Sequence, residues 1–178
     1  MEIANHLKMI EHEPHHWRVV YPYDVLANEE LFMKGKDLHN SNPIEAERIY
    51  RQVMANCGEL YIDALTHLGM ILNKRMEGTG LTYIIQAYTH SRTLFPDEFE
   101  EGKDFLLYES RGNAFVLTAY YTMAYELMKV KKWKESLEIF EFLMLINPKD
   151  NYGASRWIPQ LKEKIKAQEA EEKITKNN

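Results

Sequence analysis

The side chains best suited to chemistry lie in a histidine-rich stretch near the N-terminus. Imidazole and carboxylate groups gather there, at His6, Glu11, His12, Glu13, His15 and His16. Both groups are ligands that Zn²⁺ or Ni²⁺ takes in proteins. However, Pro14 breaks the local helix geometry that would aim these ligands at one point. We therefore expect no metal and no cofactor, and we keep a metal-binding protein or a metal-dependent enzyme as an alternative hypothesis.

Other patterns that would indicate catalysis are incomplete. The stretch Gly78-Thr79-Gly80 lacks the Lys-Ser/Thr pair that completes a phosphate-binding loop. No serine lies in the Gly-x-Ser-x-Gly setting of a nucleophile elbow. Cys57 precedes Gly58 at the expected end of a helix, where a thiol usually has a structural role. The sequence therefore predicts a protein that is not an enzyme.

The composition favours a globular, helical protein. The chain has 178 residues, of which 45% are hydrophobic and 28% are charged, and it contains only eight Gly and six Pro. So few turn-forming residues favour long helices over a fold with many strands. The net charge is −5, and no face rich in Lys and Arg is evident before the C-terminal tail. We therefore expect no nucleic-acid partner.

The sequence also carries no sign of a membrane or of secretion. The first residues lack the basic start and apolar run of a signal peptide. The most apolar segment, residues 137–146, contains two glutamates and is shorter than the ~20 residues needed to cross a bilayer. The single cysteine cannot form an internal disulfide. We expect a cytoplasmic protein with no membrane partner.

Hydrophobic periodicity and helix breakers divide the chain into an arm, three helical hairpins and a final helix. Pro14 and Pro22 predict an extended N-terminal arm over residues 1–27, with Trp17, Val19 and Tyr21 lying against the domain. The expected hairpins cover about 28–57, 60–96 and 113–148, and the apolar residues of 97–112 predict a packed insertion. Residues 154–178 form the expected capping helix and charged tail.

A pattern of small and bulky residues recurs in the three expected hairpins. The first helices carry a small residue between bulky ones, at Gly35, Gly69 and Ala124, and the second helices carry an aromatic one, at Tyr50, Tyr88 and Phe140. Proline closes the second and third hairpins, at Pro96 and Pro148. Over residues 28–151 this pattern resembles the tetratricopeptide repeat family, whose repeat has about 34 residues. It departs from the family at Ile84, which replaces a small residue, and in residues 97–112, which lengthen one repeat.

The resemblance implies an all-α, right-handed stack of about three antiparallel hairpins that ends in a capping helix. By the same resemblance, the first helices line a concave groove that holds a peptide or helix of another protein. Projecting the hairpins onto this arrangement gives the partner-binding residues Phe32, Lys36, Thr66, Met70, Asn73, Tyr121, Tyr125, Met128 and Lys129, with His39, Lys74 and Thr118 beside them. We therefore predict a non-catalytic scaffold or adaptor.

Two alternatives concern the occupant of that groove. The arm or the insertion could fold into the groove and cover its residues, or a second copy of the chain could bind there and give a homo-oligomer. Relatives that clamp a terminal carboxylate use Lys, Asn and Arg at places where this chain has Phe32, Lys36, His67, Thr118 and Thr122. Most of the charge required to hold a carboxylate is therefore missing, so we do not expect binding to such tails.

Overall fold

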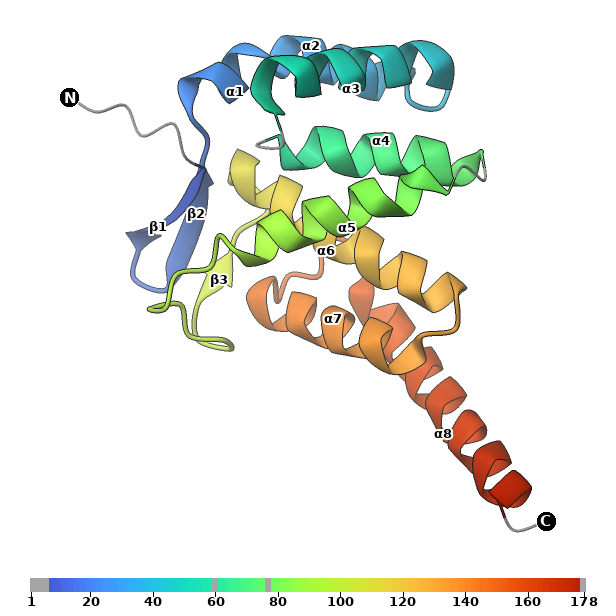
Figure 1. Ribbon diagram of the computed structural model, residues 1–178. Coiled ribbons are helices and arrows are strands. Elements are labelled where there is room, and N and C mark those ends of the chain that lie inside the picture. Colours follow the sequence, from blue (N-terminus) through green and yellow to red (C-terminus); the bar gives the residue numbers. More distant parts are fainter. Residues whose placement is uncertain (1–6, 59–60, 76–77, 177–178) are drawn as a thin grey trace.

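The computed structural model describes residues 7–58, 61–75 and 78–176, and the helices dominate this part of the chain (Figure 1). The helices are α1 (Tyr23–Ala27), α2 (Glu29–Leu38), α3 (Pro43–Cys57), α4 (Ile62–Lys74), α5 (Thr79–Arg92), α6 (Arg111–Lys129), α7 (Trp133–Ile146) and α8 (Trp157–Lys176). The strands are β1 (Lys8–Glu13), β2 (His16–Val20) and β3 (Phe105–Leu106), and a short 3₁₀ helix, η2 (Ala154–Arg156), precedes α8. None of the described helices has both the length and the apolar character needed to cross a bilayer.

Consecutive helices pack in pairs, α2 with α3, α4 with α5, and α6 with α7. Figure 1 shows these pairs one below another, with α8 projecting at the lower end. Contacts of α3 with α4, of α5 with α6, and of α4 with α6 join successive pairs, and α8 packs on α7. Leu161 is buried there, whereas most of the rest of α8 is exposed.

Small residues allow the paired helices to approach closely. A Cβ atom at Gly35 would lie 2.7 Å from a ring carbon of Tyr50, and one at Gly69 would lie 2.6 Å from a side-chain carbon of Ile84. In the third pair, Ser136 Oγ donates a hydrogen bond to the Ala124 backbone oxygen at 2.8 Å. The repeated small positions of the sequence are therefore the positions at which the helices of each pair meet.

Helix boundaries follow local signals. The Asn42 side chain caps α3 by accepting a hydrogen bond from the Glu45 backbone N–H, and Pro43 occupies the first turn. Gly58 ends the helix with a φ of 63°, which a residue with a side chain rarely adopts. Helix α6 begins at Arg111, inside the segment expected as an insertion.

The N-terminal arm is not simply extended, and the chain is not wholly helical. Strands β1 and β2 form an antiparallel hairpin, and β3, from the expected insertion, pairs with β2 in parallel, His16 opposite Phe105. The Asn113 side chain joins this sheet to α6 by accepting from the Val19 N–H at 2.9 Å and donating to the Trp17 carbonyl at 2.8 Å. The segment expected as an extended arm is therefore part of a sheet, held by backbone pairing with residues about 90 positions later in the sequence. The expected burial of Trp17, Val19 and Tyr21 is confirmed.

Candidate binding groove

A groove of about 700 Å³ lies between α4 and α6 and is closed at one side by η2 and the start of α8. We call it the α4/α6 groove. It is lined by Met70, Asn73, Lys74, Tyr121, Thr122, Tyr125, Glu126, Lys129, Arg156 and Trp157. Five of the nine residues predicted to bind a partner are among these.

Aromatic side chains form one wall of the α4/α6 groove. The rings of Tyr121 and Tyr125, one helical turn apart, are nearly parallel, with centroids 6.4 Å apart. The Tyr121 hydroxyl accepts hydrogen bonds from Trp157 Nε1 at 3.1 Å and from Arg156 Nη2 at 3.2 Å. Residues of η2 and of the start of α8 therefore orient Tyr121. Tyr125, 37% exposed, and Met70, 36% exposed, present apolar surface to a ligand.

The rim of the α4/α6 groove is cationic although the whole chain is acidic. Lys74, Lys129 and Arg156 contribute positive charge, and among the described residues of the lining only Glu126 contributes a carboxylate. Lys129 Nζ donates to Glu126 at 2.7 Å and lies 5.7 Å from the Tyr125 ring centroid, and the Arg156 guanidinium lies 4.8 Å from the Trp157 ring centroid. Cations above aromatic faces beside an apolar surface favour a ligand that is both acidic and apolar.

Two predicted groove residues, Phe32 and Thr66, are fully buried, and this corrects their assignment. The Phe32 ring packs against Tyr61 at 4.9 Å and Phe115 at 6.0 Å, so the chain itself covers this face of α2. Thr66 Oγ1 donates to the Ile62 carbonyl at 2.9 Å. Neither side chain is available to a partner.

The remaining predicted residues lie at the margins. Lys36 is exposed but outside the groove lining, with its ammonium 5.9 Å from the Phe32 ring centroid. Met128 is half-buried and packs on the core. Arg156 and Trp157, by contrast, were not expected in the groove, because Trp157 was assigned to the capping helix. The signal for them was the irregular segment that separates Pro148 from Pro159.

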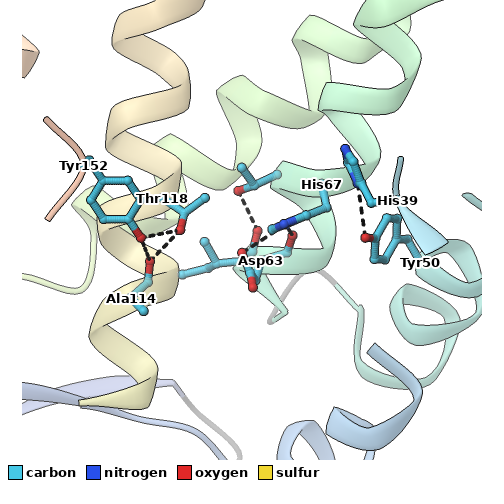
Figure 2. A network of polar contacts seen from close by, with 9 residues as sticks. His39, Tyr50, Asp63, His67, Ala114, Thr118 and Tyr152 are labelled. Carbon is cyan, nitrogen blue, oxygen red and sulfur yellow. Dashed lines mark hydrogen bonds and ion pairs between the residues drawn. The ribbon is translucent and has the colours of Figure 1, made fainter. Parts of the chain in front are cut away.

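Tyr152, from the turn after α7, packs beside the α4/α6 groove, against Tyr121. Its hydroxyl lies 2.7 Å from Thr118 Oγ1, and both oxygens lie within hydrogen-bond distance of the Ala114 carbonyl (Figure 2). Its ring stacks on Tyr121 with centroids 5.5 Å apart and is edge-to-face with Tyr108 at 5.6 Å. Burial raises the pKa of Tyr152. Tyr152 therefore contacts Thr118, which the sequence placed beside the groove and which is not part of the groove lining.

A buried ionisable pair lies on α4 (Figure 2). His67 Nδ1 lies 3.1 Å from the carboxylate of Asp63, which is 1% exposed, and 2.9 Å from the Asp63 backbone oxygen. The backbone oxygen accepts the hydrogen bond, and the contact with the carboxylate is electrostatic. Burial is the largest single influence and lowers the pKa of His67, but the charge of Asp63 and the contacts of its oxygens with the ring together exceed it, so the pKa of His67 is raised.

A second histidine faces the first. The His39 ring is perpendicular to that of His67 at 5.3 Å, and its Nδ1 lies 3.3 Å from the Tyr50 hydroxyl. Burial, followed by the His67 and Lys74 charges, lowers the pKa of His39 to about 4. Phe32 and Tyr50 pack on the His67 ring, so this cluster stabilises the floor between α2 and α4 and is not an open general base.

The N-terminal histidines do not converge. His15 Nδ1 lies 2.7 Å from Asp104 Oδ1, whereas the His16 ring faces Phe105. A backbone N–H donated by Glu100, outweighing burial and aided by His15, lowers the pKa of Asp104. Among the described residues no three His, Cys, Asp or Glu side chains gather as they would around a metal ion. His6 lies outside the described residues.

Comparisons of the chain with models of protein families, with curated proteins and with solved structures found no significant match. The geometry of the chain itself therefore carries the functional argument.

Proposed function

We propose that this protein is a non-catalytic interaction module of the tetratricopeptide type, and that its α4/α6 groove binds a short acidic, partly aromatic or aliphatic segment of another protein. Three consecutive helix pairs with small residues at their contacts support the repeat assignment. Each pair leaves apolar surface that only its neighbour can bury, which is the reason such units stack.

The observation that carries the proposal is the combination of exposed rings and cations in the α4/α6 groove. Its volume of about 700 Å³ falls in the range of ligand pockets, roughly 300–1,000 Å³, which accommodates a few side chains. Tyr125 and Met70 offer surface to an aromatic or aliphatic side chain. Lys74 and Arg156 lie close enough to meet carboxylates on the same segment.

A displayed library of random peptides tests this proposal. We expect selection on the protein to enrich Asp or Glu beside an aromatic or long aliphatic residue, and we expect the selected peptides to lose binding to Tyr125→Ala. Ile85→Ala is the matched control, because Ile85 is similarly exposed but lies on α5 outside the groove. Peptides without acidic enrichment, or equal binding to Tyr125→Ala, would contradict the proposal.

The same variants test whether a second copy of the chain is the occupant. Light scattering over a range of concentrations measures the mass of the protein. If the mass rises with concentration in the wild type and in Ile85→Ala but not in Tyr125→Ala, the groove binds a second copy of the chain. The peptide would then not be its occupant.

A further inference from the structure

A second depression lies on the other side of α6, between α5 and α7, and the segment that leads to β3 covers one end of it. Its volume is about 380 Å³. We call it the α5/α7 pocket. It is lined by Tyr88, Arg92, Phe95, Phe99, Glu101, Tyr120, Glu138, Ile139 and Phe142, none of which lines the α4/α6 groove.

Five aromatic rings wall the α5/α7 pocket. Tyr120, 3% exposed, forms the floor, with the Tyr88 ring edge-to-face at 4.9 Å and the Phe142 ring stacked at 5.2 Å. The Phe95 ring is edge-to-face with Phe99 at 4.8 Å and with Phe142 at 5.6 Å. Ring planes at such different angles present both faces and edges to the space between them, and the four rings around Tyr120 are only half-buried.

The charges at the rim of the α5/α7 pocket are mostly negative. Glu101 and Glu138 contribute carboxylates, and neither forms an ion pair within the described part of the chain. Arg92 contributes the one cation of the lining, and its guanidinium lies 5.8 Å from the Tyr88 ring centroid. Burial raises the pKa of Tyr88, Arg92 opposes the rise and the Glu138 charge adds to it, so these charges act on the aromatic walls.

We propose that the α5/α7 pocket binds a methylated ammonium group, with the ring faces around the methyl groups and the two carboxylates balancing the charge. Aromatic faces attract cations, and a methylated ammonium is weakly hydrated, so that entering an aromatic cavity removes little solvation. An anion would meet two carboxylates at the rim, and a neutral apolar group would make no use of them. Arg92 already places a cation over one of the rings.

Titration with small probes tests this assignment by the ring resonances of an aromatic NMR spectrum and by calorimetry. Choline and an Nε-trimethyl-lysine amide are the cationic probes, and 3,3-dimethylbutan-1-ol is the neutral probe of the same shape as choline. We expect both cations to shift the rings of the pocket, and the neutral alcohol to bind about tenfold more weakly. Tighter binding of choline would identify a free small molecule as the natural source, and tighter binding of the lysine derivative would identify a modified side chain.

Variants that leave the core intact sharpen the test. Glu138→Gln and Glu101→Gln should each lower the affinity for the cationic probes about threefold. Arg92→Gln should raise this affinity, because a positive charge that repels the probe is removed. Glu98→Gln, an exposed change in the same segment but outside the lining, should leave the affinity unchanged.

Three results would overturn the assignment. They are binding of the neutral alcohol as tight as that of choline, weaker cation binding in Arg92→Gln, and ring resonances that neither cation shifts. Phe95→Ala should abolish binding, and a thermal melt by circular dichroism shows whether this variant is folded. Because the charge variants keep the aromatic walls, the assignment stays testable if Phe95→Ala unfolds.

Discussion

Two depressions flank helix α6, and they differ in the charge at their rims. Tyr121 and Tyr125 line the α4/α6 groove, whereas Tyr120, the neighbour of Tyr121 in sequence, forms the floor of the α5/α7 pocket. Counted over the described residues, the groove lining has three cations and one carboxylate, and the pocket lining has two carboxylates and one cation. Aromatic surface is common to both, so the rim charges decide which ligands each can attract.

Of the substitutions on the two sides of α6, the one at the floor of the α5/α7 pocket should have the largest effect on stability. Tyr120→Ala removes a buried ring that packs against Tyr88, Phe95 and Phe142, and it should lower the free energy of unfolding by about 3–5 kcal/mol. Urea unfolding followed by circular dichroism measures this change. A loss below about 1 kcal/mol would mean that the ring is not part of the core.

On the groove side of the same helix, a substitution should affect peptide binding more than it affects stability. Tyr125→Ala removes a ring that is more than one-third exposed and that packs on Tyr121 and Trp157, so the free energy of unfolding should fall by about 1 kcal/mol, much less than in Tyr120→Ala. The affinity for an acidic peptide should fall by about 2 kcal/mol, because an aromatic anchor is lost. Calorimetry with peptide, and separately with choline, measures both sites. An equal loss of choline binding would show that the two depressions are not independent.

A change of rim charge should produce a smaller effect. Lys74→Glu brings a carboxylate to the α4/α6 groove and should weaken the binding of an acidic peptide by about 1 kcal/mol. The affinity should also depend less strongly on salt, because an attraction between opposite charges is lost. The affinity of choline for the α5/α7 pocket should not change. Peptide titrations at low and high salt give the result, and an unchanged salt dependence would contradict the role of Lys74.

The smallest effect is a dependence of stability on pH. The pKa of His67 is raised in the folded state, so its contribution is complete below its unfolded pKa of about 6.5 and is lost as the pH rises through the folded value. The pKa of His39 is lowered to about 4, so stability is lost as the pH falls from about 6.5 towards 4.

Urea unfolding from pH 4 to pH 9 separates these two contributions. His67→Gln should remove the decline above pH 6.5, and His39→Gln should reduce the decline below it. If both variants kept the wild-type profile, the His67 and His39 rings would not titrate as their surroundings imply.

The helices could be predicted from the sequence because their signals are local. Asn42-Pro43 begins α3 and Gly58 ends it, and both use only the conformations of neighbouring residues. The small residues, such as Gly35, indicated the helix contacts because each contact lies within one hairpin. The pairing of β2 with β3 left no such signal. It joins Trp17 to Leu106, and β3 has only two residues.

The groove was predicted in part for the same reason. Helical spacing put Tyr121 and Tyr125 on one face, which requires no knowledge of other segments. Phe32 was misplaced because the rings that cover it, Tyr61 and Phe115, come from other segments of the chain. Thr66 was misplaced as well, since it is fully buried and its hydroxyl bonds to the backbone of its own helix. The α5/α7 pocket was missed because three of its rings lie on three different helices and the other two, Phe95 and Phe99, lie on the irregular segment after α5.

The central claim is that the α4/α6 groove binds acidic, aromatic or aliphatic peptides. An ¹⁵N-labelled sample titrated with a selected peptide tests it most directly. The account predicts shifts of backbone amides in Met70–Lys74, in Tyr121–Lys129 and at Arg156–Trp157, with those of Tyr88–Phe99 unmoved. Shifts confined to Tyr88–Phe99, or the same shifts in Tyr125→Ala at the same peptide concentration, would contradict it.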